Sequence, residues 1–127
     1  MAGGYAADKG RAVNIAILHN TTFQGREGEV ALQFNCDKIL ISNNIFYGNP
    51  GQAYLQNRGS NNNGVTVQCN LYFGQSNSSP GSWKDAQAKY QNPLLVGPPA
   101  NLKLSAGSPA IGAACDPGQP DLGAHKY

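Results

Sequence analysis

Side chains that could perform acid–base catalysis are few in this sequence. It contains seven acidic residues and two histidines, whereas enzymes that cleave glycosidic bonds need two facing carboxyl groups. Glu27 and Glu29 stand close together in one loop, which is typical of a solvated turn. His19 is a candidate general base, but no acidic residue at a matching position would orient its ring, which favours a structural role. We therefore predict no catalytic residue, no metal site and no cofactor.

The three cysteines also carry little sign of chemistry. Cys36, Cys69 and Cys115 stand far apart in the sequence, and their spacings match no Cys-x-x-Cys metal or redox motif. Free cysteines are among the most buried residue types, so small apolar side chains in the core are the favoured interpretation. One disulfide with one free thiol stays open as an alternative, and the sequence does not indicate which pair would form it.

The composition indicates one domain with many turns and a neutral polar surface. The chain has 127 residues, of which 13% are charged, about half the share in a typical soluble domain. Asparagine (14) and glutamine (9) are abundant, beside 16 glycines and 8 prolines. A net charge of +2 without a basic run predicts no nucleic-acid partner. Apolar stretches of about four to five residues predict no membrane span.

Three segments repeat one pattern, and these elements would have to position any site. Each reads apolar-x-apolar-x-x-Asn-x-x-aromatic, with a glycine shortly after it: Ile15–Phe23, Ile39–Tyr47 and Val65–Phe73. Their offsets along the chain are therefore 24 and then 26. Apolar residues at every second position are typical of short strands. A second column aligns Val30–Phe34 with Ala53–Asn57 at an offset of 23.

The repeats predict a solenoid in which each strand lies beside its equivalent, about 4.8 Å away, in parallel sheets. The columns expected to face inward are Ile15/Ile39/Val65, Ile17/Ile41/Val67, Thr21/Ile45/Leu71 and Phe23/Tyr47/Phe73. Asn20, Asn44 and Asn70 form a polar column that is identical in all three repeats. Because asparagine tolerates the left-handed backbone of a bend and can bond to its copies above and below, we expect a structural ladder.

With these repeats the chain resembles the right-handed parallel β-helix proteins of the pectate-lyase-like family. Its last third is similar to the closing segment of many such proteins, in the stretches Asn92–Val96, Asn101–Leu104, Ser108–Ile111 and Asp121–Ala124. Ile111–Cys115 departs from the family, which usually has Ile-Asp-Ala-Gly there. A leucine-rich repeat fits less well, because Ala12, Cys36 and Asn62 stand where that fold needs leucine. The resemblance implies a secreted or cell-surface protein, although residues 1–11 contain no signal peptide.

We therefore predict an all-β fold, a right-handed parallel β-helix solenoid of about three to four coils with a short C-terminal capping helix and tail. The expected parts are an N-terminal leader or incomplete coil (1–12), the coils (13–75), and the capping helix with the closing segment (76–127). The helix would span Ser82–Tyr90, with Ser82 as N-cap, Asp85 as the capping-box acid and Trp83 wedged over the last coil. Helix and tail would cover the C-terminal end. An uncovered N-terminal coil predicts self-association through that coil or a longer parent protein.

The second column provides the candidate binding surface. Its alternation places an aromatic ring, several amides and an arginine outward, a set that suits stacking on sugar rings and hydrogen bonding to hydroxyls: Gln33, Asn35, Gln52, Tyr54, Gln56 and Arg58. In enzymes of the resembling family, this sheet forms the substrate groove. The shortage of acids favours a non-catalytic carbohydrate-binding or structural module, with a polysaccharide as partner, in an oligomer or a longer protein. The alternatives are a fragment of a pectate-lyase-like polysaccharide lyase or hydrolase, and a stiff adhesin spacer.

Overall fold

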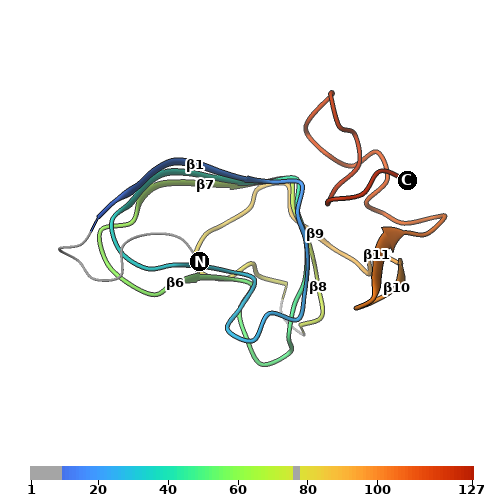
Figure 1. The fold of residues 1–127 in the computed structure, drawn as a ribbon, viewed down its shortest axis with the longest axis horizontal. Helices are drawn as coiled ribbons and strands as arrows, with labels where there is room; N and C mark the ends of the chain where they lie inside the picture. The colour runs from blue at the N-terminus through green and yellow to red at the C-terminus, as the bar shows by residue number, and fades with distance from the viewer. Residues whose placement is uncertain (1–9, 76–77) are drawn as a thin grey trace.

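The computed structural model describes residues 10–75 and 78–127, so most of the expected leader (1–12) lies outside the described residues. Within these ranges the fold is all-β, as predicted, and no helix is present that could cross a membrane. Parallel pairing builds three sheets, and one antiparallel hairpin follows them (Figure 1). The strands are β1 (Ala12–Leu18), β2 (Thr21–Phe23), β3 (Val30–Leu32), β4 (Cys36–Ser42), β5 (Ile45–Tyr47), β6 (Leu55–Asn57), β7 (Asn63–Gln68), β8 (Leu71–Phe73), β9 (Lys89–Tyr90), β10 (Leu95–Gly97) and β11 (Asn101–Leu104).

The three sequence repeats lie side by side, and the view of Figure 1 superimposes them. Their first strands pair in the order β1–β4–β7 and their second strands in the order β2–β5–β8, all in parallel. Ile39 pairs with both Ile15 and Val65, which confirms the predicted alignment of the repeats at offsets of 24 and 26. Branched apolar residues recur at every second position of the first strands, which suits strands that bury one face.

The pairing of β3 with β6 differs from the prediction. Val30 lies opposite Leu55, so the offset is 25 and the predicted offset of 23 was wrong. The connection between Tyr47 and Leu55 is one residue longer than the connection between Phe23 and Val30. The preceding strands β2 and β5 are offset by 24, and the extra residue raises the offset to 25.

The main core lies in the space enclosed by the three parallel sheets. It joins Ile39 and Ile41 of β4 to Leu55 of β6 and to the aromatic rings of Phe46 and Tyr72, and all five side chains are at most 1% exposed. Burial of this apolar area is the main term that stabilises the stacked repeats. A second cluster lies on the opposite face of the β2–β5–β8 sheet.

Two columns that were expected to face inward instead face this second cluster. Ile45 and Leu71 are fully buried there against the chain segment that follows β9. The Thr21/Ile45/Leu71 and Phe23/Tyr47/Phe73 columns were therefore assigned to the wrong face. The bend at the ladder asparagines turns the chain between the two strands of each repeat, so the alternation of the first strand does not continue into the second.

The predicted capping helix at Ser82–Tyr90 is absent, and so is the helix N-cap at Ser82. The segment instead contains a bend and a turn and ends in β9: Gly81 forms a bridge with Leu55 of β6, and β9 pairs with β8 of the third repeat. Trp83 does pack against the core, as expected, but from this non-helical segment. Competing backbone bonds explain the error, because Ser82 N donates to Leu55 O at 3.0 Å and Lys89 N to Asn70 O at 3.0 Å.

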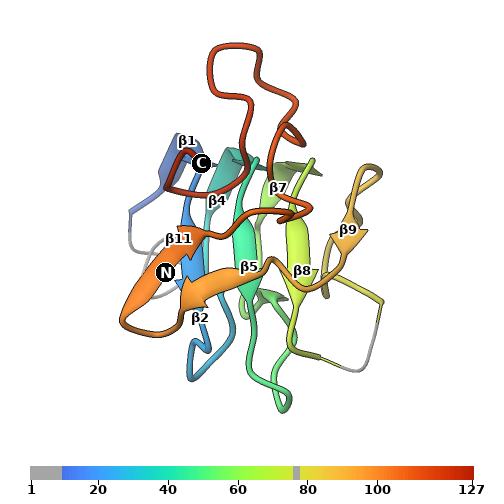
Figure 2. The same ribbon diagram turned by 90° about the vertical axis from the view of Figure 1, so that its right-hand side faces the viewer.

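The tail after β9 covers the side of the stacked repeats rather than their C-terminal end (Figure 2). Leu104, Ala110 and Leu122 pack onto the outer face of the β2–β5–β8 sheet. Gly123 N donates to Asn43 O at 2.9 Å, and Ala124 N to Thr21 Oγ1 at 3.0 Å. The prediction of an end cap made by the tail was wrong because the outward apolar columns of this sheet need a cover of their own.

Among residues 10–75 and 78–127, no strand pairs with the N-terminal side of the stack. β1 is an edge strand, and its Ile15 is 38% exposed whereas the paired Ile39 is 1% exposed. Val13 and Leu18 of the same strand are exposed as well. A cavity of about 560 Å³ opens beside them, and its lining includes Ile17, Asn20, Thr22, Glu29 and Phe46.

Candidate functional site

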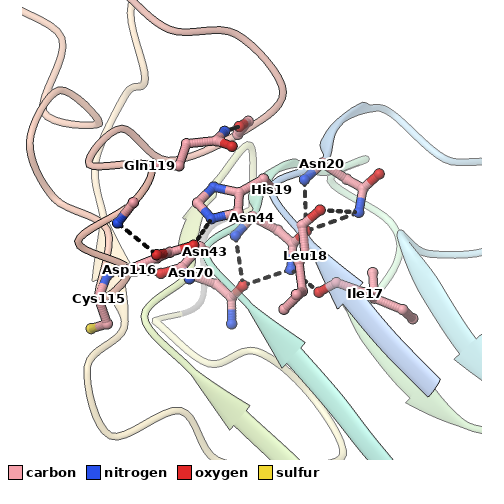
Figure 3. A network of polar contacts seen from close by, with 12 residues as sticks. Ile17, Leu18, His19, Asn20, Asn43, Asn44, Asn70, Cys115, Asp116 and Gln119 are labelled. Atoms are coloured by element: carbon pink, nitrogen blue, oxygen red, sulfur yellow. Dashed lines mark hydrogen bonds and ion pairs between the residues drawn. The ribbon is translucent and has the colours of Figure 1, made fainter. Parts of the chain in front are cut away.

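The ladder asparagines are joined by paired hydrogen bonds at the bends (Figure 3). Asn44 Oδ1 accepts from Asn20 N at 2.8 Å and from Asn20 Nδ2 at 3.2 Å. Asn70 Oδ1 accepts the equivalent two bonds from Asn44, each at 2.9 Å. Both Asn44 and Asn70 are fully buried. The ladder therefore has a direction in its acceptors, because each Oδ1 accepts from the preceding repeat. The Nδ2 groups also donate back to that repeat, Asn44 Nδ2 to Ile17 O and Asn70 Nδ2 to Ile41 O.

Asp85 ends this ladder. Its Oδ2 accepts from Asn70 N at 3.0 Å and from Asn70 Nδ2 at 2.9 Å, the same pair of bonds that joins two asparagines. The carboxylate also accepts from Cys69 N, Gln87 N and the Tyr72 hydroxyl. Burial, together with this carboxylate, raises the pKa of Tyr72, so the phenol stays protonated and donates.

Sequence reasoning assigned Asp85 to a helix cap and missed this role. Asp85 follows Asn70 at well short of one repeat length, and it is an aspartate in a column of asparagines. The single available signal is chemical: the last asparagine needs an acceptor for its two donors, and a carboxylate has acceptors but no donor that would need a further partner.

The residues that precede the ladder asparagines fasten the tail to the stack (Figure 3). His19, Asn43 and Cys69 have left-handed φ values of 51°, 59° and 57°. Cys69 forms a disulfide with Cys115, and Asn43 Oδ1 accepts from Cys115 N at 2.8 Å. The structure thus has the alternative of one disulfide and one free thiol. Cys36 and Cys69 are buried, as the core interpretation predicts, whereas Cys115 is exposed.

His19 has an acidic partner, contrary to the expectation. Its Nε2 lies 3.1 Å from Asp116 Oδ2, and this partner was missed because it comes from the tail rather than from another repeat. The backbone N–H of Gly118 and the His19 ring lower the pKa of Asp116. A catalytic triad would place a nucleophile at the second ring nitrogen, but His19 Nδ1 is buried and receives no hydrogen bond from the described residues. The His19–Asp116 pair therefore fits a structural role, in which it fastens the tail to the first repeat.

Two residues of the predicted binding surface are buried. Tyr54 is 1% exposed, with its ring 5.1 Å from that of Tyr72 and its hydroxyl accepting from Gln75 N at 3.1 Å. Asn35 is 8% exposed and bonds to Asn61 and to Gly10 O. Both had been expected to point outward. They lie in bends outside β3 and β6, where the alternation of a strand does not apply.

Three other predicted residues form a connected polar surface with one residue that the sequence did not single out for binding. Gln56 Nε2 donates to Gln52 Oε1 at 3.1 Å, and Arg58 Nε donates to Gln56 Oε1 at 2.7 Å. Arg58 also pairs with Glu27, at 3.3 Å between Nη1 and Oε2. We call Glu27, Gln52, Gln56 and Arg58 the polar row. Gln33, the remaining predicted residue, is half-buried just after β3, and its backbone oxygen accepts from Asn62.

The polar row can hydrogen-bond to neutral or charged hydroxylated ligands, since it combines amides, one guanidinium and one carboxylate. Tyr54, the aromatic residue that was expected in this row, is buried and does not belong to it. In the part of the chain that the structure describes, no three His, Cys, Asp or Glu side chains gather to hold a metal ion.

Replacing Glu29 by glutamine is expected to remove one source of pH dependence. Glu29 lines the N-terminal cavity, where Oε1 accepts from Gly25 N at 2.7 Å, and burial raises its pKa above 4.5. The folded state then binds the Glu29 proton more tightly than the unfolded state, so protonation of Glu29 stabilises the fold. This stabilising contribution is present below pH 4.5 and is lost as the pH rises through the folded-state pKa. Urea unfolding from about pH 4 to about pH 7 should show wild type losing stability relative to E29Q. Parallel pH profiles would contradict the expectation.

Comparisons with known proteins assign no family. The chain matches no family model, no curated protein and no solved structure.

Proposed function

We propose that this chain is a segment of a right-handed parallel β-helix that works as a non-catalytic structural module and closes the C-terminal end of such a helix. The parallel registers and the alignment of the three repeats support stacked coils. Like residues then lie on like residues, as in the Ile15/Ile39/Val65 column, which is how solenoids are stabilised without a conventional globular core.

The observation that carries this proposal is the difference between the two ends of the ladder. At the C-terminal end, Asp85 accepts both donors of Asn70, and the segment with Trp83 lies over the core. At the N-terminal end, the side chain of Ile15 and the edge of β1 are exposed. Among the described residues, the C-terminal end of the ladder thus has its donors satisfied, whereas the N-terminal end has an unpaired strand edge, as expected for a terminal piece of a longer stack.

A non-catalytic role agrees with where the acids lie. Glu27 forms an ion pair with Arg58, and Asp85 accepts hydrogen bonds from the last ladder asparagine. Asp116, which lies in the tail, contacts the His19 ring. Each of these carboxylates has a structural partner, and none faces a second carboxyl group among the contacts of the described residues. The Cys69–Cys115 disulfide supports a secreted or cell-surface location, because such bonds persist in oxidising compartments.

Amide hydrogen exchange under native conditions tests the structural module. The amides of β1 should exchange fastest among the strands of the three repeats, while Cys69 N and Asn70 N, which donate to Asp85, should be among the slowest. Equal protection at both ends of the stack, or faster exchange at Asn70 than in β1, would contradict an open N-terminal and a closed C-terminal end.

Carbohydrate binding is a second candidate function, and the connected polar row is the observation that favours it. Affinity electrophoresis against acidic and neutral polysaccharides should show retardation that is lost in R58A and Q56A. The matched control is Y54F, which removes a buried hydroxyl that accepts from Gln75 N and should cost about 1 kcal/mol of stability without changing retardation. Retardation that depends on Tyr54 instead of Arg58 would contradict this surface, and no retardation by any polysaccharide would leave the structural role alone.

A further inference from the structure

We propose that the N-terminal face of the stack docks one further β-helix coil of defined chemistry, with apolar-x-apolar-x-x-Asn along its edge and with the amide donors of its asparagine free. This face consists of β1, Asn20 and the cavity beside them. The inference rests on the proposed function and adds the identity of the partner.

The ladder's direction defines the polar part of this surface. Asn20 uses its donors within the chain: N and Nδ2 donate to Asn44 Oδ1, and Nδ2 also donates to Leu18 O. Its Oδ1 receives no hydrogen bond from any residue between 10 and 75 or 78 and 127. In Asn44 and Asn70 the same oxygen accepts two bonds from the preceding repeat. The partner must therefore present an N–H and an amide Nδ2 to this oxygen.

The edge strand and its exposed side chains define the apolar part. β1 pairs only with β4 among the described strands, so its other side offers backbone groups for a parallel strand. Ile15 belongs to a column that is buried one repeat further on, at Ile39. A new coil with branched apolar residues opposite Ile15 and Ile17 would extend both columns and fill the cavity of about 560 Å³.

A second copy of this chain meets these requirements less well than an uncapped coil does. Its C-terminal face offers no free asparagine donors, because Asp85 accepts both donors of Asn70. Its N-terminal face would bring one Asn20 Oδ1 acceptor toward another. The partner of matching chemistry is a coil whose C-terminal face is uncapped. Self-association through β1, which the sequence predicts, is therefore the competing outcome of the test.

The test inserts a duplicate of residues 36–61 between Arg11 and Ala12 of the full chain, with alanine at the duplicated Cys36 position. Cys36 pairs with Ala12, and Cys36 N donates to Asn62 Oδ1, so the added segment has the length of one repeat and enters in register. Its copies of Ile39, Ile41 and Asn44 would lie over Ile15, Ile17 and Asn20. The matched control carries the same insertion with its Asn44 copy replaced by alanine.

The expected result is that β1 amides exchange roughly tenfold or more slowly in the extended chain, because added hydrogen bonds must open first. The alanine control should show a smaller gain. Unchanged exchange in β1, or an equal gain in the control, would overturn the inference. A dimer of the original chain with protected β1 amides, detected by sedimentation, would also overturn it in favour of a second copy.

Failure of the inference is separable from failure of the proposed function. If Cys69 N and Asn70 N are protected in the original chain but β1 does not respond to the added coil, the partner is wrong and the closing role stands. If these two amides are unprotected as well, the closing role itself fails.

Discussion

Replacing Asp85 by alanine is expected to lower the free energy of unfolding by about 3–5 kcal/mol. The carboxylate accepts five hydrogen bonds, and the donors on Cys69 N, Asn70 N and Tyr72 are buried. Alanine would leave these donors without a partner, and each unsatisfied buried group costs about 1–3 kcal/mol. Since a domain of this size is stable by about 5–15 kcal/mol, the loss is a large share of the total.

Urea unfolding provides the measurement, with two controls. D85N keeps one acceptor oxygen but introduces an NH₂ group among donors, so its stability should lie between wild type and D85A. D37A removes an exposed ion pair, in which Arg11 Nη2 lies 3.4 Å from Asp37 Oδ2, and should change stability by less than about 1 kcal/mol. If D85A unfolds at the same urea concentration as D37A, Asp85 does not end a ladder.

Removing the Cys69–Cys115 disulfide is expected to cost about 4 kcal/mol. The sequence separation of the two cysteines is 46, and closing a loop of that length in the unfolded chain gives this value in the chain-entropy description. The bond also joins the bend of the third repeat to the tail, so its loss should loosen the tail from the outer face of the β2–β5–β8 sheet. Ile45 and Leu71, which the tail covers, would become accessible.

A variant with both cysteines replaced by serine, compared with wild type under oxidising conditions, measures this effect. The expected signature is faster proteolysis within residues 105–127 and faster amide exchange in β5 than in β4. Should the variant not fold, reduction of the folded wild type provides the same comparison. Cys36→Ala is the matched control, because this thiol is buried and free and its loss should leave tail proteolysis unchanged. Tail proteolysis that does not respond to disulfide loss would contradict the fastening role.

The stacked first strands could be predicted because each position repeats its residue type. A branched apolar residue at Ile15, Ile39 and Val65 is a local signal, and the register follows from it directly. The faces of the second strands could not be predicted in the same way. Both Ile45 and Phe46 are apolar and fully buried, so alternation does not distinguish the inner face from the face under the tail.

The candidate site was harder to predict because its contacts join parts of the chain that share no pattern. Asp116 in the tail reaches His19 in the first repeat, and Asp85 completes a column of asparagines without being one. Tyr54 was assigned to the surface by extending strand alternation into a bend. In each case the deciding factor was tertiary packing or the need to satisfy a buried donor, neither of which a repeat alignment contains.

The central claim, that three repeats stack in parallel register, is tested most directly by NMR contacts between methyl groups in the isotope-labelled protein. Ile39 should give cross-peaks to both Ile15 and Val65, its partners in β1 and β7. Ile45 should give cross-peaks to Leu122 and Leu71 in the cluster under the tail. Contacts of Ile39 with residues of an antiparallel or shifted register, or with neither neighbour, would contradict the stacked fold and everything argued from it.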